Sequence, residues 1–456
     1  MNRQKEYNQC DSQKACSECS FEAFCKAWVD FVLAHNDEKF YAHFDKRVSL
    51  AMPSIRQYVM DREKVAVHSF YPFIHFEKKN SRYGKKGPKK PRQLYYCSHL
   101  DRCVYQRYAF LLNQEYNKRI KNTVIDSVAI AYRDNLGKNN IDFAKEAFDK
   151  IKNESHCIVI VGDFTDFFDR LDHQYLKEML CNLLNVKKLP QDYYAVFKNI
   201  TRFASWDWKL LVEQSGHRIT ERGIRTKLNK QDVILNKSRF EKHKTSIVKN
   251  NSSKGIPQGS PISAVLSNIY MLQFDKAVSD YVLEHSGTYM RYSDDFLVIL
   301  PYKNEQDIQE HENWIFSQVN KTKGLDLQKE KTSVYIYDRG SIVNYPSNQS
   351  STIDYLGFVF DGSNVKLRPK SITKYYYRMR RKAQTIGRSH WQSPKGKHIS
   401  ARKLYDIYSS GGEHQTFIDY AKRAKSILNL NDREADALIK HHKRKIANAI
   451  KSGEKK

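Results

Sequence analysis

Acidic residues adjoin short apolar runs at two distant places in the chain. The run Ile158-Val-Ile-Val-Gly ends at Asp163, and Asp294 and Asp295 stand directly before Phe-Leu-Val-Ile-Leu300. Apolar runs of this length predict buried strands. Carboxylates are the hard oxygen ligands that Mg²⁺ prefers, and two such ions can activate a hydroxyl and stabilise a leaving pyrophosphate. The pattern predicts phosphoryl transfer if neighbouring strands of one sheet bring Asp163 and Asp294 together.

A third segment lies between these two. Gly255-Ile-Pro-Gln258-Gly259-Ser260-Pro-Ile-Ser predicts a tight turn that opens a helix, and Leu266-Ser-Asn268-Ile-Tyr270 follows it. An Asp-Asp pair by itself is typical of an ordinary β-turn. The chemical interpretation therefore depends on all three segments together.

The three segments resemble motifs A, B and C of reverse transcriptases. They supply Asp163-x-x-x-Phe167-Phe168, Pro257-Gln-Gly-Ser260 and Tyr292-Ser-Asp-Asp295. In the order of that family, Gly324-Leu-Asp-Leu-Gln-Lys-Glu-Lys331-Thr332 resembles motif D, and Tyr355-Leu-Gly357-Phe358 resembles the primer-grip motif E. The resemblance covers roughly residues 65 to 360.

The resemblance implies roles for individual residues. Asp163, Asp294 and Asp295 would hold two Mg²⁺ ions, with Mn²⁺ a possible substitute, and Lys331 would donate a proton to the leaving pyrophosphate. The residues implied for nucleotide binding are Lys85, Arg92, Phe168, Gln258 and Gly259, with Arg133 a weaker candidate. The residues implied beneath the primer end are Tyr355, Leu356 and Gly357.

An aromatic residue five positions after Asp163 has a further implication. In the resembled pocket Phe168 would occupy the space that a ribose 2′-hydroxyl needs, which favours deoxynucleotides and argues against an RNA replicase. Phe167 and Phe168 are adjacent, so we expect one of them to pack the palm while the other faces the pocket.

The resemblance implies an α+β right-hand polymerase fold with an antiparallel palm sheet. We expect a helical N-terminal extension over residues 1–50, fingers over 51–156, a palm over 157–362 and a helical, basic thumb over 363–456. Within the fingers, 67–76 and 92–96 predict a hairpin with a cationic tip. Helices are predicted within 101–150. Asn431 and Glu434 resemble a capping box that opens a final helix, whose one face is Leu438, Ile439, His442, Ile446 and Ile450.

The chain is strongly basic. Its 456 residues carry 78 Lys and Arg against 51 Asp and Glu, a net charge of +27, which favours polyanionic partners. No apolar run approaches the roughly 20 residues of a membrane span, and no secretory signal is evident. We therefore expect no membrane partner and a cytoplasmic protein with reduced thiols. The cluster Cys10, Cys16, Cys19 and Cys25 could be free thiols or a zinc site.

Two basic regions lie outside the motifs. The palm carries an insertion at about 185–250, where Trp206 and Trp208 are mixed with basic residues. That mixture suits stacking and backbone contact with single-stranded RNA, or a solvated insertion. The basic residues of the insertion are Lys209, Arg218, Arg222, Arg225 and Lys227, and those of the thumb are Lys374, Arg378, Arg380, Arg381 and Lys382.

The segments Arg291-Tyr-Ser-Asp-Asp295 and Gly255-Ile-Pro-Gln-Gly-Ser260 look most like those of the bacterial unknown-group, defence-associated reverse transcriptases. That resemblance implies dNTP substrates, a DNA product and a dedicated noncoding RNA as template, and it is compatible with a homo-oligomer. Two alternatives remain open: a protein-primed or untemplated DNA synthase of the abortive-infection type, and an RNA-binding, maturase-like scaffold.

Overall fold

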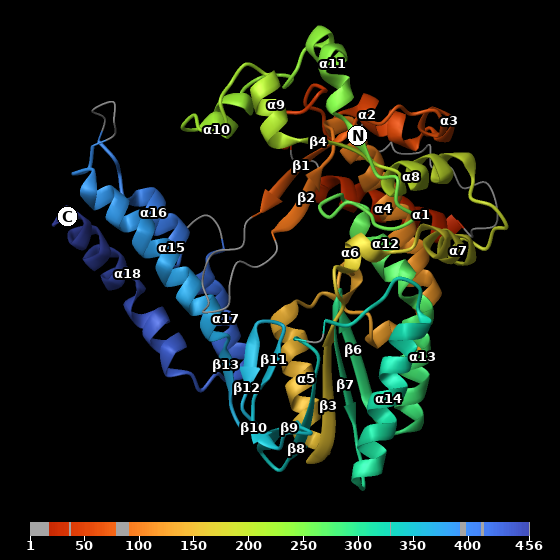
Figure 1. The fold of residues 1–456 in the computed structure, drawn as a ribbon, viewed down its shortest axis with the longest axis vertical. Helices are drawn as coiled ribbons and strands as arrows, with labels where there is room; N and C mark the ends of the chain where they lie inside the picture. Colours follow the sequence, from red (N-terminus) through yellow and green to blue (C-terminus); the bar gives the residue numbers. More distant parts are fainter. Residues whose placement is uncertain are drawn as a thin grey trace. The chain divides into compact units, whose positions relative to one another are not determined.

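The computed structural model describes residues 18–35, 38–78, 91–328, 330–392, 398–411 and 415–455. The chain has an α+β fold (Figure 1) that divides into two compact units. Unit 1 contains 1–133, 164–277 and 318–326, and unit 2 contains 134–163, 278–317 and 327–456. The fingers, palm and thumb boundaries expected from the sequence stay a prediction.

Unit 1 consists of helices and a four-stranded sheet in the order β2-β1-β4-β5. The strands are β1 (Phe73–Lys78), β2 (Arg92–Tyr96), β4 (Ala204–Asp207) and β5 (Val248–Lys249). The helices are α1 (Glu18–His35), α2 (Pro53–Met60), α3 (Arg62–Ala66), α4 (His99–Ile120), η2 (Val124–Ser127), α6 (Phe167–Arg170), α7 (His173–Leu183), α8 (Gln191–Thr201), α9 (Trp208–Gln214), α10 (Ile224–Leu228), α11 (Lys237–His243), η4 (Lys244–Ser246) and α12 (Ser263–Tyr270).

The predicted hairpin is confirmed, but its first strand is Phe73–Lys78 and not 67–76 as expected. Strands β1 and β2 pair antiparallel, from Ile74 opposite Tyr96 to Lys78 opposite Arg92. The cationic tip, including Lys85, lies outside the described residues. Strand β4 joins the other edge of β1 in parallel, so the inserted segment after residue 203 begins as part of the same sheet.

Unit 2 contains a six-stranded sheet in the order β10-β9-β8-β3-β7-β6 and a three-stranded sheet in the order β11-β12-β13. The strands are β3 (His156–Asp163), β6 (Thr288–Tyr292), β7 (Asp295–Leu300), β8 (Ser333–Asp338), β9 (Ser341–Tyr345), β10 (Gln349–Ser350), β11 (Ile353–Tyr355), β12 (Phe358–Phe360) and β13 (Val365–Leu367). The helices are η3 (Asp134–Leu136), α5 (Asn140–Glu154), α15 (Pro369–Arg388), α16 (Arg402–Tyr408), α17 (Phe417–Leu428) and α18 (Arg433–Glu454). Helices α13 (Leu272–Glu284) and α14 (Glu305–Lys321) contribute residues to both units.

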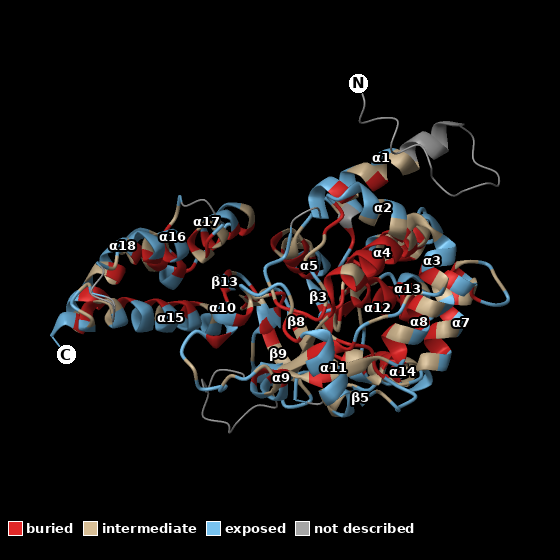
Figure 2. Ribbon diagram, turned by 90° about the horizontal axis from the view of Figure 1, so that it is seen from above, coloured by how far each residue is buried: buried red, intermediate tan, exposed pale blue. Residues whose placement is uncertain are grey.

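Strand β3 is the interior strand that positions the acidic residues. Every residue from Cys157 to Asp163 is buried, and the strand pairs antiparallel with β7 and with β8. Figure 2 shows buried residues concentrated where these strands and α5 lie. The strands predicted at 157–162 and 296–300 are therefore confirmed, and they are direct neighbours.

The C-terminal helices confirm the predicted helical region and correct one detail. The N-cap of α18 is Asp432, whose side chain accepts hydrogen bonds from the backbone N–H groups of Glu434 and Ala435. The predicted capping box at Asn431 is wrong, because a better acceptor stands one residue later and Asn431 donates instead to Asn364. Leu438, His442, Ile446 and Ile450 are buried as expected, whereas Ile439 is only partly buried.

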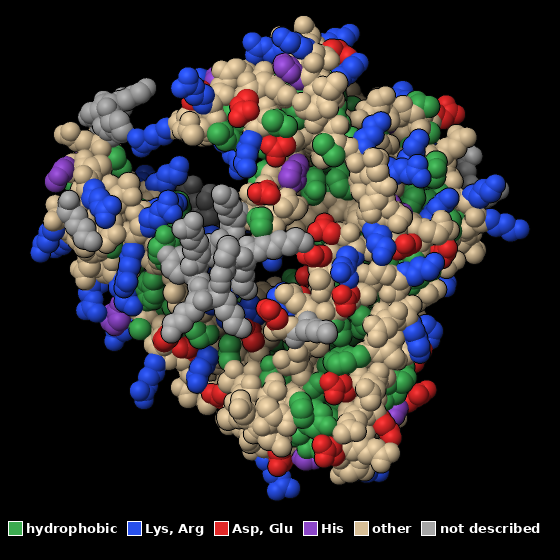
Figure 3. All heavy atoms as spheres, in the orientation of Figure 1, with side chains coloured by type: hydrophobic (Ala, Val, Ile, Leu, Met, Phe, Trp, Pro, Cys, Tyr) green, Lys and Arg blue, Asp and Glu red, His purple; other side chains and the backbone are tan. Residues whose placement is uncertain are grey.

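The remaining surface features agree with a basic chain. Figure 3 shows Lys and Arg side chains spread over the face that it draws.

Among the described residues no helix is long and apolar enough to cross a bilayer. Cys25 is a free thiol; Cys10 and Cys16, and the side chain of Cys19, lie outside what the structure describes.

Candidate active site

Two of the acidic residues face each other across adjacent strands of unit 2. In the antiparallel β3–β7 pair, Asp163 is directly opposite Asp295. Asp163 is 7% exposed. Like charges directly opposite in a sheet destabilise it, so this register has a cost unless a cation compensates for it. The sequence predicted that Asp163 and Asp294 meet; the residue directly opposite Asp163 is Asp295, and Asp294 is close enough for the charge of Asp163 to raise its pKa.

The third acid lies in the turn between β6 and β7. Tyr292 pairs with Asp295, which leaves Ser293 and Asp294 as a two-residue loop. Ser293 has φ = 62°, a conformation that L-residues seldom adopt and that often marks functional sites. The fully buried guanidinium of Arg291 donates from Nη1 to the carbonyl of Ser293 at 3.0 Å. Arg291 therefore stabilises the turn, a role that the sequence motif did not reveal.

The electrostatics of the acids are those of crowded carboxylates. Burial raises the pKa of Asp294, and the charge of Asp163 adds to that rise. Burial, the charge of Asp294 and a hydrogen bond to Asp163 raise the pKa of Asp295 to about 7. Desolvation and like charge both disfavour the ionised form, so a bound cation would restore the full negative charge.

An ammonium group already lies on this cluster. Lys331 Nζ contacts Asp163 Oδ2 at 2.7 Å, and its charge lowers the pKa values of both Asp294 and Asp295. The backbone N–H of Gln328 donates to the carbonyl of Asp163 at 2.8 Å. The segment that resembles motif D is thereby fastened to the end of β3.

The acids do not form a complete coordination shell by themselves. In the described part of the chain, no group of three or more His, Cys, Asp or Glu side chains is arranged to hold a metal ion. Mg²⁺ sites commonly use one or two carboxylates and take their other ligands from phosphates and water. The donor set fits an ion that arrives with a nucleotide better than a permanent structural metal.

The segment predicted as the primer grip forms a tight hairpin turn in unit 2. Leu356 and Gly357 have φ values of 49° and 96° and connect β11 to β12, where Tyr355 pairs with Phe358. Asn140 donates from Nδ2 to the carbonyl of Leu356 at 3.0 Å and to the hydroxyl of Tyr420 at 2.9 Å. Asn140 at the start of α5 and Tyr420 in α17 therefore fix the turn, and neither carried a local signal in the sequence.

Tyr355 itself is a buried residue. Its side chain is 1% exposed, and burial together with the charge of Asp295 raises the pKa of its hydroxyl. The backbone of the turn, rather than this hydroxyl, is what the hairpin can offer to a ligand.

In unit 1, the loop that resembles motif B is docked on strand β2. The N–H of Tyr95 donates to the carbonyl of Gln258 at 2.9 Å. Gly259 has φ = 117°, and a Cβ at this position would lie 2.4 Å from the carbonyl oxygen of Tyr95. Only glycine fits here, because both the backbone angle and the close approach exclude a side chain.

The helix that follows this loop is fastened in the interior. Asn268 is 1% exposed and donates from Nδ2 to the carbonyl of Ala131 at 2.9 Å. Tyr270 accepts a hydrogen bond from the N–H of Asp172 and donates to the carbonyl of Lys323. The Asn and Tyr of the downstream motif are therefore structural ties within unit 1.

The two adjacent phenylalanines differ in burial. Phe167 is 3% exposed and stacks on Phe164 with ring centroids 5.7 Å apart. Phe168 is only partly buried, and its ring meets that of Phe167 at 67°. The structure thus separates the pair as expected, with Phe167 as the packing residue and Phe168 as the candidate that contacts a nucleotide.

The two arginines expected to contact phosphate, Arg92 and Arg133, also differ in burial. Arg92 is exposed at the start of β2. Arg133 is 7% exposed, with its guanidinium bonded to the Asp126 carboxylate at 2.6 Å and to Asn117 at 3.2 Å. The expectation that Arg133 contacts a nucleotide is therefore wrong, because its donors are used in the interior of unit 1.

The sequence left two alternatives open for the insertion, and the structure contradicts the one in which its tryptophans stack on bases. Trp206 is 0% and Trp208 is 7% exposed, and both belong to a core with Phe44, Ile74 and Leu211. Aromatic rings buried between helices and strands offer no face to a nucleic-acid base. The sequence could not show this, because a tryptophan beside lysines suits a core edge as well as a binding surface.

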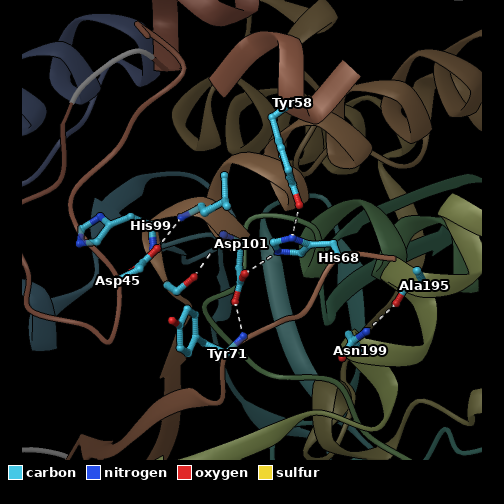
Figure 4. Close-up of polar contacts among 10 residues, drawn as sticks. Asp45, Tyr58, His68, Tyr71, His99, Asp101, Ala195 and Asn199 are labelled. Carbon is cyan, nitrogen blue, oxygen red and sulfur yellow. Dashed lines mark hydrogen bonds and ion pairs between the residues drawn. The ribbon is translucent and has the colours of Figure 1, made fainter. Parts of the chain in front are cut away.

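In unit 1, Tyr58, His68 and Asp101 form a hydrogen-bonded chain like that of a proton relay (Figure 4). The Tyr58 hydroxyl lies 2.7 Å from His68 Nδ1, and His68 Nε2 lies 2.8 Å from Asp101 Oδ1. Asp101 also accepts from the N–H of Tyr71 at 3.0 Å. Burial and the charge of Asp101 raise the pKa of Tyr58, so the phenol stays protonated. The cluster ties α2 and the segment after α3 to α4 and does not generate a nucleophile.

The family profile that matches this chain covers the same elements. A profile of the family described as reverse transcriptase (RNA-dependent DNA polymerase) matches residues 78–360, more than half of the chain. The chain belongs to the reverse transcriptase family. The matched range contains the opposed acids, the motif B loop and the primer-grip hairpin, and a search of curated proteins returned no match.

Solved structures similar to this chain include telomerases of two Candida species. Apo telomerase from Candida tropicalis truncated from its C-terminal domain is 13% identical with a TM-score of 0.41, covering 71% of this chain and 61% of that chain. The untruncated apo enzyme is 12% identical with a TM-score of 0.41, covering 96% and 67%. Telomerase from Candida albicans with a fragment of telomeric RNA is 12% identical with a TM-score of 0.37, covering 98% and 74%. The family assignment rests on the profile match.

Proposed function

We propose that the chain is an RNA-directed DNA polymerase that adds dNTPs to a 3′-hydroxyl with two Mg²⁺ ions. The observation that carries the proposal is the β3–β7 register, which sets Asp163 opposite Asp295 beside the turn at Asp294. Opposed carboxylates with raised pKa values are costly in a sheet. A bound cation would offset the repulsion between these carboxylates, which explains why the chain places them together.

The ions would be held by Asp163, Asp294 and Asp295, with phosphate and water oxygens completing their shells. Their chemistry would be to activate the attacking hydroxyl and to stabilise the leaving pyrophosphate. Mn²⁺ could substitute, because carboxylate, phosphate and water oxygens also suit it. Lys331 is the candidate proton donor to the pyrophosphate, and its contact with Asp163 supports its placement at the same cluster.

The substrate contacts are proposed from the elements that expose them. Gln258 and Gly259 would border the nucleotide, Arg92 and Lys85 would contact its phosphates, and Phe168 would exclude the 2′-hydroxyl. Leu356 and Gly357 would support the primer end through their backbone. The support for these roles is the family match, together with the exposed Arg92 and Gly259 and the partly buried Phe168 and Gln258.

The template that we propose is a dedicated noncoding RNA, copied in the bacterial cytoplasm as part of antiviral defence. The support is the resemblance of Arg291-Tyr-Ser-Asp-Asp295 and Gly255-Ile-Pro-Gln-Gly-Ser260 to defence-associated enzymes, together with the +27 net charge. Helix α15 presents a basic surface suited to the RNA backbone, made of the exposed residues Lys374, Arg378, Arg380, Arg381 and Lys382. A homo-oligomer belongs to the same proposal and would show in the mass of the purified protein.

Primer extension on an RNA template with dNTPs and Mg²⁺ tests the activity. Asp294→Asn should reduce extension to the background of the assay. The matched control is Asp338→Asn, because Asp338 is an acid of the same sheet that is 57% exposed and lies near His156 at the other end of β3. Full activity of Asp294→Asn, or equal loss in both variants, would overturn the metal-site assignment.

Sequencing of nucleic acid that co-purifies with the wild type and with Asp294→Asn separates the alternatives. DNA complementary to a bound RNA, present only with the wild type, supports templated synthesis. DNA of simple sequence attached to the protein identifies a protein-primed or untemplated synthase. Bound RNA without DNA in either sample identifies a scaffold.

A further inference from the structure

The segment after β4 has an excess of positive charge, and most of it lies outside the motifs that the chain shares with its family. Residues 208–254 contain twelve Lys and Arg residues against four Asp and Glu residues. All twelve basic residues are exposed. Figure 3 shows Lys and Arg side chains at the upper edge of the view, where Figure 1 places α9, α10 and α11.

Few of these charges are neutralised within the protein. Lys227 lies 3.6 Å from Glu221, Lys244 lies 2.8 Å from Glu241, and Arg225 lies over the rings of Phe76 and Trp208. Arg239 donates to the backbone carbonyl of Ser215. Lys237 is close enough to Glu241 for its charge to lower the pKa of that carboxyl. The other basic side chains of the segment have no acidic partner among the described residues: Lys209, Arg218, Arg222, Lys230, Lys242, Lys249 and Lys254.

The segment holds these charges on a folded support. Leu211, Leu228 and Ile234 are buried in the core that contains Trp206. Trp206 Nε1 donates to Gln214 Oε1 at 2.8 Å, and Gln214 in turn donates to Ser246 Oγ. The N–H of Ile234 donates to the carbonyl of His43 at 2.7 Å. A surface fixed in this way loses little conformational entropy when a ligand binds.

The position of the aromatic residues decides which polyanion fits. Strand β4 and the segment after it have three aromatic residues, Trp206, Trp208 and Phe240, and each packs in this same core. Proteins that hold single strands use exposed aromatic rings on which bases stack. Duplexes are instead recognised through their shape and phosphates. Phosphate contact is the interaction that this surface can make.

We propose that residues 208–254 form a binding surface for the phosphate backbone of double-stranded nucleic acid. Lysine and arginine side chains at fixed separations would contact successive phosphates, and no base would stack on the segment. This role is separate from nucleotide addition, so it does not depend on the proposed function.

Binding of the full-length chain to labelled probes, measured without dNTPs and divalent metal, tests the proposal. The probes are a duplex of about 20 base pairs of RNA, long enough to span the roughly 16 base pairs that a duplex-binding domain contacts, a DNA duplex of the same sequence and a single RNA strand of equal length that cannot pair. The test variant is the triple Arg222→Gln, Lys230→Gln and Lys242→Gln. The matched control is the triple Lys187→Gln, Lys188→Gln and Lys198→Gln, which removes the same charge from exposed positions in the α7–α8 region.

The slope of log affinity against log salt should fall by about 1 for each lost phosphate contact, so the test triple should reduce the duplex slope by about 3. The control triple should leave it unchanged. If the test triple loses affinity for the RNA duplex alone, the ligand is structured RNA. If it loses affinity equally for the RNA and DNA duplexes, the surface binds a duplex of either kind. Unchanged duplex binding by the test triple, or a larger loss on the single strand, would overturn the proposal.

Discussion

The motif B loop offers a sharp test of how the site is positioned, through Gly259→Ala. Gly259 has φ = 117°, outside the left-handed region that alanine can reach at modest cost, and a Cβ would lie 2.4 Å from the carbonyl oxygen of Tyr95. Contacts of this kind normally exceed about 3.0 Å. The loop must therefore move away from β2 by several tenths of an ångström.

Two contributions make up the free-energy cost of this substitution. A residue forced into a sparsely populated backbone region costs about 1–3 kcal/mol. Moving the loop weakens the 2.9 Å hydrogen bond from Tyr95 to Gln258, which costs a further 0.5–1.5 kcal/mol or so. A total of about 2–4 kcal/mol is a substantial fraction of the stability of a domain. A displacement of about 1 Å can reduce a rate by roughly a hundredfold, so a shift of several tenths of an ångström should reduce catalysis by about tenfold.

The assay is single-nucleotide incorporation, with thermal unfolding measured in parallel. Gly259→Ala should reduce kcat/KM for dNTP by about tenfold while the protein remains folded. Gly137→Ala is the control, because Gly137 also has a positive φ, 62°, but a Cβ added there would meet no atom of the described residues within 4 Å. Incorporation by Gly259→Ala within a fewfold of the wild type would refute the close-approach argument.

Individual side chains carry three further predictions. Phe168→Ala should admit ribonucleotides, since it removes the partly buried ring beside Phe167, and an unchanged ratio of dNTP to rNTP incorporation would remove that assignment. Lys331→Gln should lower kcat by about 10²–10⁴ with little change in KM, as expected for a lost general acid; an unaffected kcat would leave Lys331 with only an electrostatic role. Burial and the nearby His99 lower the pKa of His43 to about 3, so the unfolded state binds protons more readily below about pH 6.5 and stability is lost as pH falls. The loss is about 2 kcal/mol at pH 5, and His43→Leu should reduce the drop in thermal midpoint between about pH 7.5 and pH 5; equal drops would contradict this.

The order of the motifs made the family and the α+β fold predictable. Runs such as Ile158–Val161 and Phe296–Leu300 have the length and composition of buried strands, and acids at their ends are visible without coordinates. The hairpin of β1 and β2, helix α1 and the C-terminal helices were predictable for the same reason, whereas residues 38–50, also expected to be helical, contain no helix. These features depend on neighbours in the sequence, whose spacing can be read directly.

Several details of the site depended on contacts between distant segments. Asn140 and Tyr420 fix the turn at Leu356, the predicted primer grip, across more than two hundred residues of chain, and Arg291 supports the Ser293 turn from the interior. No local pattern distinguishes such residues from ordinary polar side chains. Their roles follow from the non-local packing that brings their donors to a particular carbonyl.

Residue types and their spacing established which side chains could do chemistry. Packing between distant segments established which of the candidate binding residues are exposed to a ligand. Arg133 and Trp206 both look like ligand-binding residues in the sequence, yet the first bonds Asp126 and the second lies in a core. The physical reason is that a side chain's type is a property of one position, whereas its exposure depends on which elements pack against it. Burial of Trp206 and Trp208 also removes the single-strand alternative that the sequence left open, and leaves phosphate contact as the interaction proposed for this segment.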